Sequence, residues 1–446
     1  MERVINNKSL EITAVLIGAV LGILGFIFPL KTLVLAVGGM AGLILVLWKY
    51  EIGVYAVVGF IPLAPTSALV GLILLTFISS LLKLYRENNF KFRINPLDVL
   101  VILLGTVLIY SSVTSYTVKS SILALLMHIA FIVFYFVLTN TIKTRQQLLS
   151  LIALLVMTSS VAALYGLYQY KFGGATSEAW VDTTMFEDIK SRVGSTFDNP
   201  NVFGEYLVLI IPVAVAMLWG QKGRFSKLMT MVLAAVMLVC LMVTYSRGAY
   251  IGIVLAAGLF AVLRDKRFVV LGIIGLLLLP FILPPSVINR FASIGNLQDT
   301  SSSYRISVWL GSLKIVRDFW PSGIGLGLEP FKLIYPKYSL TAAYAFHSHN
   351  IYLQLLIETG ATGFVLFLGM LLVFYKTTLT NFYKTKDKFL STFMIAISAG
   401  LAGYLVQGLV ENIWYNYRVL LSFWVMMALG MIARGIMKKD SGVLRL

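Results

Sequence analysis

The hydrophobic residues of this chain gather in apolar runs that follow one another from end to end. Most runs are about 17 to 22 residues long, enough to cross a bilayer as a helix. Because lipid cannot hydrogen-bond the backbone, a segment inside it must be helical. The pattern predicts an all-α polytopic membrane protein with about 12–14 transmembrane helices, near residues 12–30, 32–48, 52–63, 66–82, 97–113, 120–139, 148–168, 203–219, 228–246, 249–263, 268–284, 358–375, 389–411 and 416–433.

Two of these runs need a choice of interpretation. Residues 12–30 follow a basic start but carry no small-residue cleavage site, and another apolar run comes directly after them. We interpret the run as a retained helix, not as a signal peptide. Residues 52–63 form a short run that ends at Pro62 and Pro65, so it is either a short span or a re-entrant segment.

Two long polar segments divide the chain. We expect N-terminal transmembrane helices over 1–168, an extracytoplasmic loop over 169–202 and central transmembrane helices over 203–284. An extracytoplasmic catalytic lobe over 285–357 and C-terminal transmembrane helices over 358–446 complete the division. The loop ends in Asp198-Asn199-Pro200-Asn201, which predicts a turn and a helix N-cap. Aromatic and aliphatic residues throughout 285–357 indicate a folded lobe, with an amphipathic helix near 304–319.

The distribution of charge sets the predicted orientation. The formal net charge of +17 would suit a nucleic-acid partner, but most basic residues flank the apolar runs in short clusters. Such clusters orient membrane proteins with their positive loops inside, and they attract anionic lipid headgroups. They lie near residues 3–8, 49, 83–93, 143–145, 222–227, 264–267, 376–388 and 434–445. Both termini are therefore predicted to be cytoplasmic, with the two long segments outside.

Composition excludes several other classes of protein. With 59% hydrophobic and 12% charged residues and a mean hydropathy of +0.89, the chain is not a soluble globular protein. Its only cysteine, Cys240, lies in an apolar run, so there is no disulfide framework or thiolate metal site. The sequence has no Gly-rich phosphate loop, His-Glu-x-x-His pattern or nucleophile elbow.

Two arginines stand out as candidate anion-binding residues. Arg247 lies between two predicted spans with almost no loop, where a guanidinium is costly unless it meets an anion or a wet cavity. It either snorkels to a lipid phosphate or binds a ligand that the small neighbours Ser246 and Gly248 allow to come close. Arg305 shares a predicted helix face with Trp309 and Ser312. That helix either lies on the membrane surface or contributes to a site.

Arg192 and Arg290 are secondary candidates for the same role. Either could simply be a solvated loop charge, and we interpret them first in that way. Neither residue has a sequence context that singles it out.

The histidines include one candidate catalytic residue. His349 sits just before an apolar helix, and its titration near neutrality suits a general base acting on a hydroxyl. The alternative is a capping or interfacial histidine. Gly360 and Gly363 follow in register for close helix contact. His347 is a secondary candidate that we interpret as a solvated loop residue, and His128 is interpreted as a packed core histidine.

No metal or other cofactor is predicted. Two outward histidines without a nearby acidic cluster make a poor divalent-metal site. Phosphate chemistry here would instead rely on arginine, which donates two parallel hydrogen bonds from a rigid fork.

The motifs then resemble those of a known family. His349-Asn350, nine residues, Gly360, two residues and Gly363 resemble a signature of the O-antigen ligase and polymerase superfamily. Ser246-Arg247-Gly248-Ala249, the Arg305 stretch with Pro321-x-Gly-x-Gly325, and Gly194-Ser-Thr-Phe-x-Asn199-Pro-Asn201 are similar to other segments of that family. The resemblance covers roughly residues 190 to 430, and the first part of the chain matches only as a run of helices.

The resemblance implies a metal-independent, inverting glycosyltransferase of the membrane class C (GT-C) in the bacterial cytoplasmic membrane. The donor would be a glycan on undecaprenyl pyrophosphate at the outer face, used in lipopolysaccharide or other surface polysaccharide biosynthesis. Arg247 and Arg305 would hold the pyrophosphate, and His349 would take the proton of the acceptor hydroxyl. The partners would be this donor, a glycan or lipid A core acceptor and membrane lipids, with no nucleic acid.

Three functions remain open at this point. A ligase transfers the glycan to a lipid A core or a protein, whereas a polymerase joins lipid-linked repeat units, and the motif does not separate them. We favour the ligase narrowly. A transporter of a lipid-linked oligosaccharide or small anion would also have many spans and intramembrane arginines, but the sequence shows no inverted repeat.

Overall fold

The computed structural model describes residues 29–86, 92–173, 191–296, 300–340 and 344–440, together with Val15 and Ile189. Within these ranges every regular element is helical, which confirms the all-α prediction. The first expected span, 12–30, lies almost entirely outside the described residues, as do parts of the two long polar segments.

Long helices account for most of the described chain. The first half contains α2 (Leu30–Trp48), α3 (Tyr50–Phe60), α4 (Thr66–Arg86), α5 (Asp98–Val113), α6 (Val118–Thr141) and α7 (Arg145–Phe172). The second half contains α8 (Pro200–Ala216), α9 (Arg224–Met242), α10 (Arg247–Arg264), α11 (Lys266–Ile282), α15 (Ile351–Asn381), α16 (Lys388–Gln407) and α17 (Tyr417–Asp440).

These helices confirm a polytopic membrane protein. Nine helices in the described part of the chain are long and apolar enough to cross a membrane, and three shorter apolar helices accompany them. The predicted short run at 52–63 is a helix of 11 residues, α3. Asn199 caps α8 as predicted, because its side chain accepts hydrogen bonds from the backbone of Asn201 and Val202.

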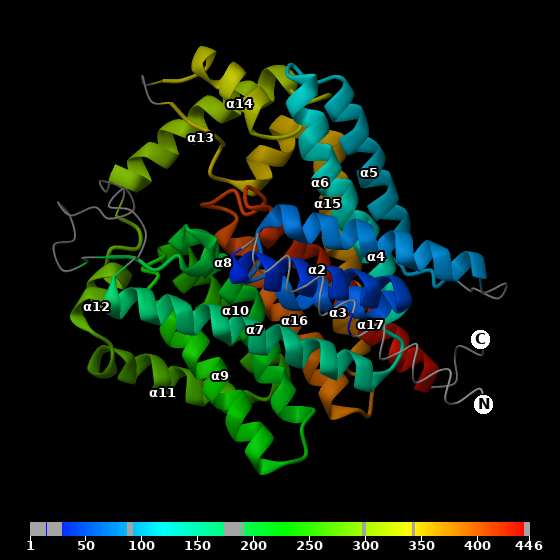
Figure 1. Ribbon diagram of the computed structural model, residues 1–446. Coiled ribbons are helices and arrows are strands. Elements are labelled where there is room, and N and C mark those ends of the chain that lie inside the picture. The colour runs from blue at the N-terminus through cyan, green and yellow to red at the C-terminus, as the bar shows by residue number, and fades with distance from the viewer. Residues whose placement is uncertain are drawn as a thin grey trace.

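The centre of the bundle consists of α8, α16 and α17, whose apolar segments are more than four-fifths buried. Helix α10 packs closely on α16 at a pair of glycines (Figure 1). A Cβ atom on Gly252 would lie only 2.8 Å from the carbonyl oxygen of Gly403, so only glycine fits at this crossing. The crossing brings the start of α10, at Arg247, beside the end of α16, at Gln407.

The segment between α11 and α15 forms a small lobe of three helices. These are α12 (Pro285–Ala292), α13 (Thr300–Phe319) and α14 (Leu328–Ile334), and α13 and α14 lie at the top of Figure 1. The lobe has a hydrophobic core of its own that includes Val308, Ile315, Phe331 and Tyr335. The predicted folded lobe is therefore present, while the side of the membrane on which it lies stays a prediction.

Helix α15 breaks at Gly360, and this corrects the expected role of the two motif glycines. Gly360 has φ 66°, and a Cβ there would lie 2.6 Å from the carbonyl oxygen of Pro321. The break lets the lobe backbone hydrogen-bond the helix: Ile324 N donates to Ile357 O at 2.8 Å, and Ala361 N donates to Trp320 O at 2.7 Å. Gly360 therefore packs against the backbone of the lobe at Pro321, not against a second helix. The closest neighbour of Gly363 is Thr359 of the same helix.

Candidate active site

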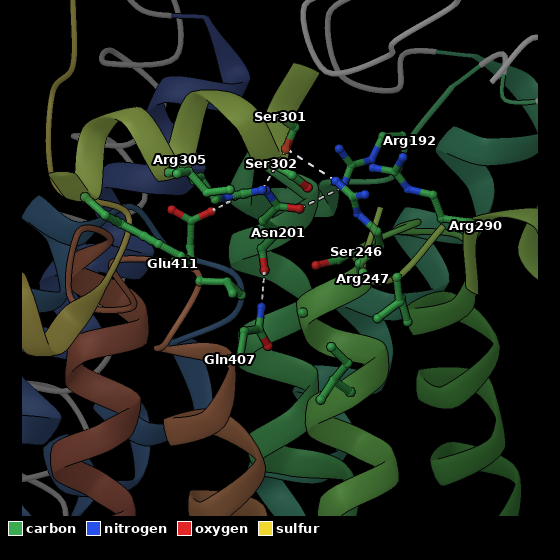
Figure 2. Close-up of a pocket in the computed structure, with 17 residues that line it drawn as sticks. Arg192, Asn201, Ser246, Arg247, Arg290, Ser301, Ser302, Arg305, Gln407 and Glu411 are labelled. Carbon is green, nitrogen blue, oxygen red and sulfur yellow. Dashed lines mark hydrogen bonds and ion pairs between the residues drawn. The ribbon is translucent and has the colours of Figure 1, made fainter. Parts of the chain in front are cut away.

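A cavity of about 250 Å³ opens where the lobe meets the ends of α8, α10 and α16. Figure 2 shows Arg192, Arg247 and Arg290 gathered on one side of it and Arg305 with Glu411 on the other. The complete lining consists of Arg192, Asn201, Ser246, Arg247, Gly248, Ile251, Arg290, Ile294, Gly295, Ser301, Ser302, Arg305, Ile306, Trp309, Gln407, Val410 and Glu411. The cavity therefore brings Arg247 and Arg305 together with the two secondary candidates, Arg192 and Arg290.

Arg247 is held at the cavity by the short turn between α9 and α10. It is the first residue of α10, and Ser246 caps the helix by accepting a hydrogen bond from Ala249 N. The guanidinium donates to Ser293 O at 3.3 Å and to Ser301 Oγ at 3.5 Å. The first backbone N–H groups of a helix carry partial positive charge, so the start of α10 adds to the positive potential of the cavity.

Arg192 and Arg290 are buried, with 6% and 8% of their surface exposed, so their interpretation as solvated loop charges was wrong. The α9–α10 turn explains their burial because its carbonyl groups face them. Arg192 Nε donates to Thr244 O at 3.0 Å, and Arg290 Nε donates to Tyr245 O at 3.1 Å. Burial, with a further contribution from neighbouring arginines, first among them Arg290, lowers the pKa of Arg192 to about 9, which leaves it charged at neutral pH.

Arg305 approaches from the lobe on α13. Its guanidinium donates to Ser301 Oγ at 2.6 Å and pairs with Glu411 at 3.2 Å. Its Nε is buried and has no hydrogen-bond partner among the described residues. Trp309, one turn later, lines the same cavity, as expected from the shared helix face.

His349 borders the cavity through two residues that line it. Its Nδ1 lies 2.8 Å from Glu411 Oε1, and its carbonyl oxygen accepts a hydrogen bond from Trp309 Nε1 at 3.3 Å. The imidazole is 22% exposed. His349 has φ 50°, an uncommon conformation for a residue other than glycine. The next residue, Asn350, caps α15 and fixes where this strained turn ends.

His347 is buried, with 6% of its surface exposed, so its interpretation as a solvated loop residue was also wrong. Its Nδ1 accepts a hydrogen bond from His349 N at 3.1 Å, and the two rings lie 4.1 Å apart. Burial and the adjacent His349 lower the pKa of His347 to about 3. His128 is 6% exposed and packs edge-on against Trp414, which confirms that it belongs to the core.

Glu411, in the turn between α16 and α17, is the residue that the sequence did not reveal. It bridges Arg305 and His349. Burial alone would raise the pKa of Glu411, but His349 and Arg305 outweigh that effect and hold the pKa below its ordinary value. An acidic residue in a short turn between two apolar runs was the available signal, but nothing in the sequence pairs it with a histidine 62 residues away.

Glu411 also places one acidic group beside the two histidines, where the sequence indicated no acidic cluster. Ligand atoms of His347, His349 and Glu411 all lie within 4.8 Å of one another. The described contacts already engage Nδ1 of both imidazoles and both oxygens of the carboxylate. That no metal takes part remains a prediction.

The charges around the cavity favour a multivalent anion. Four arginines and a single carboxylate line it, and most of these groups are shielded from water. Like charges held together in a site of low polarity are costly until an anion neutralises them. Guanidinium groups match phosphate oxygens with paired hydrogen bonds, so a phosphate or pyrophosphate group suits this arrangement.

Comparison with known proteins agrees with the motifs. No curated protein matches the chain in a sequence comparison. Residues 232–368 match a protein-family model described as O-Antigen ligase, and this segment contains Arg247, Arg290, Arg305, His347 and His349. Over these residues the chain is similar to the O-antigen ligase family, in agreement with the resemblance of its sequence motifs.

Proposed function

We propose that this protein is a membrane glycosyltransferase that moves a glycan from undecaprenyl pyrophosphate to an acceptor hydroxyl on the outer face of the cytoplasmic membrane. The observation that carries this proposal is the arginine-lined cavity bordered by the His349–Glu411 pair. It offers a place for an anionic leaving group beside a base for the attacking hydroxyl. The multi-pass helices suit a donor that is anchored in lipid.

In this proposal the arginines act on the leaving group. Arg247, at the start of α10, and Arg305, on α13, approach the cavity from opposite sides (Figure 2). A pyrophosphate between them would meet a guanidinium on each flank, with Arg192 and Arg290 adding charge behind Arg247. As the bond between the anomeric carbon and the phosphate oxygen breaks, negative charge grows on that oxygen, and donors already in place stabilise it.

His349 would act on the acceptor. Nδ1 of His349 lies 2.8 Å from Glu411 Oε1. In the tautomer with the proton on Nδ1, the imidazole would donate to Glu411 and keep the lone pair on Nε2 as the base. Nε2 takes the proton of the acceptor hydroxyl while its oxygen attacks the anomeric carbon. Undecaprenyl pyrophosphate departs from the opposite face, so a single displacement inverts the anomeric centre.

The same chemistry serves a ligase and a polymerase, and we retain the ligase as the favoured assignment. The decisive difference is the acceptor, which is a lipid A core or similar molecule for a ligase and a second lipid-linked unit for a polymerase. The matched family description names the ligase.

The test uses purified full-length protein and its native undecaprenyl-pyrophosphate-linked oligosaccharide, with and without a lipid A core acceptor. Products are separated on gels and identified by mass spectrometry. Transfer that requires the second acceptor indicates a ligase, and a ladder of lengthening lipid-linked chains from donor alone indicates a polymerase. We expect His349→Ala to abolish either product while donor binding persists, and the exposed Arg317→Ala to behave as wild type.

Two results would contradict the proposal. Full activity of His349→Ala would remove the general-base assignment. A well-folded wild-type sample that forms no product from the native donor, with or without acceptor, would instead favour the transporter.

A further inference from the structure

Two adjoining cavities lie far from the arginine-lined cavity, around the first residues of α3 and the last turns of α4. The other end of α3 lies near the start of α8, which contributes to the candidate active site, since Pro62, just beyond α3, accepts a hydrogen bond from Thr196. Tyr50 begins α3, and a helix of 11 residues is about 16 Å long. These cavities are therefore separate from the candidate active site.

The first cavity, of about 600 Å³, is basic and lies at the turn between α2 and α3. Its lining includes Lys49, Lys83 and Arg86, with Glu51 as the only acidic residue among them. Lys83 pairs with Glu51 at 2.8 Å, so two more cations than anions line this space. Such a balance suits one phosphate-bearing headgroup with a net negative charge.

Trp48 places this basic cavity at the level of lipid headgroups. It is the last residue of α2, lines the cavity and is 72% exposed. Exposed tryptophans at the ends of transmembrane helices concentrate at the membrane–water interface. The depth of the cavity therefore matches that of a phosphate group, independently of its charge.

The second cavity, of about 580 Å³, is apolar and extends between α4, α5 and α6. Most of its lining is aliphatic or aromatic, including Phe77, Leu84, Ile102 and Val133. Its polar residues are engaged within the protein: Asp98 accepts from Tyr135 at 3.0 Å and from Asn95 N at 2.7 Å, and Asn140 accepts from Arg93 N at 2.8 Å. The remaining wall suits a hydrocarbon chain.

The two cavities meet at Tyr50 and Lys83, which line both. Exposed apolar residues, among them Ile94, Val99 and Ile102, lie along the apolar cavity, so a lipid could enter from the side. We propose that these cavities bind one anionic phospholipid, with its phosphate at Lys49, Lys83 and Arg86 and one acyl chain between α4, α5 and α6.

The test measures lipid binding to full-length protein in detergent by native mass spectrometry, with phosphatidylglycerol and phosphatidylcholine as probes. Each basic residue near a headgroup favours an anionic lipid, so we expect phosphatidylglycerol to bind about tenfold more tightly. The double substitution Lys83→Gln with Arg86→Gln should remove most of that preference. The matched pair Arg224→Gln with Lys227→Gln, in a basic cluster at the start of α9, should retain it.

A second pair of variants tests the apolar cavity without changing charge. Ser80→Phe places a ring in the cavity and should reduce phosphatidylglycerol binding severalfold, whereas Ile78→Phe, on the exposed face of the same helix, should not. Thermal unfolding confirms that each variant is folded. Equal binding of the two lipids, or equal effects of the two members of either variant pair, would overturn the proposal.

Discussion

Arginine side chains define the candidate site, and contacts within the protein hold them in place. Arg192 and Arg290 are anchored by carbonyl oxygens of the α9–α10 turn, and Arg305 is anchored by Ser301 and Glu411. The guanidiniums are therefore positioned before any ligand arrives. Preorganised donors stabilise developing charge without paying for reorganisation at the moment of reaction.

Substitutions of Arg247 test whether binding of the pyrophosphate needs a planar guanidinium or only a positive charge. Arg247→Ala should lower kcat/KM about 10²- to 10³-fold, the usual effect of removing one such donor. Arg247→Lys should recover little of this loss, because an ammonium cannot form paired hydrogen bonds with phosphate. Steady-state kinetics with varied donor concentration measure the effect. Wild-type turnover in Arg247→Lys would contradict the bidentate role.

A substitution of Glu411 tests whether this carboxylate orients His349 for catalysis. Glu411→Gln keeps the side-chain shape but removes the charge that stabilises the protonated imidazole. We expect kcat to fall about 10²- to 10⁴-fold, as in other carboxylate–histidine pairs, with a smaller change in the KM for the donor. Glu329→Gln, which breaks an exposed pair with Lys332, is the control. A change confined to KM would show that Glu411 acts only through Arg305.

His347 makes the stability of the protein depend on pH. An unfolded histidine binds a proton near pH 6.5, whereas burial lowers the pKa of the folded His347 to about 3. Between these values the unfolded state binds more protons, so stability falls as the pH falls from about 6.5. We expect Tm to decline between pH 7 and pH 5, and to decline less in His347→Gln. An equally steep decline in both proteins would contradict this assignment.

At the scale of elements, the break in α15 attaches the lobe to the bundle. The broken helix leaves Ile357 O and Glu358 O to accept hydrogen bonds from Ile324 N and Gly325 N, and Ser111 Oγ also donates to Glu358 O. These hydrogen bonds thereby fix the position of the lobe that carries Arg305 relative to the helix that follows His349. Only a residue that tolerates positive φ without a side chain fits at Gly360.

Gly360→Ala should therefore destabilise the protein by about 1–3 kcal/mol, from backbone strain and from the clash with Pro321 O. Gly369→Ala is the matched control, because it lies in the same helix and its Cβ would meet only ordinary contacts with Leu100. Thermal unfolding in detergent compares the two. Equal Tm values would show that the break tolerates a side chain.

Local patterns predicted the elements better than they predicted the site. Apolar runs located the described long helices, Asn199 was identified as a cap, and the short turn before Arg247 is present. These features depend on residues close together in sequence. The burial of Arg192 depends on Thr244, 52 residues away, and Glu411 meets His349 across 62 residues. Such partners are set by helix packing, which a single sequence does not encode locally.

At the scale of the whole molecule, the site draws on segments from Arg192 to Glu411. The close crossing of α10 and α16 at Gly252 and Gly403 sets the position of Arg247 relative to Gln407. The two adjoining cavities that we assign to a phospholipid are lined by α2 to α6 instead, so the two sites draw on different helices. Changes in one of these regions can therefore be tested without altering residues of the other.

Glu411 follows the four arginines and His349 in the chain, and this order has a consequence for biogenesis. During synthesis the ribosome makes all four arginines, His347 and His349 before it makes α16 and the turn that carries Glu411. A nascent chain at that stage has a cationic cluster without its internal counter-charge and a histidine without its partner. The site is therefore completed only after α16 is made, and a chain truncated before Glu411 cannot form the contact between His349 and this carboxylate.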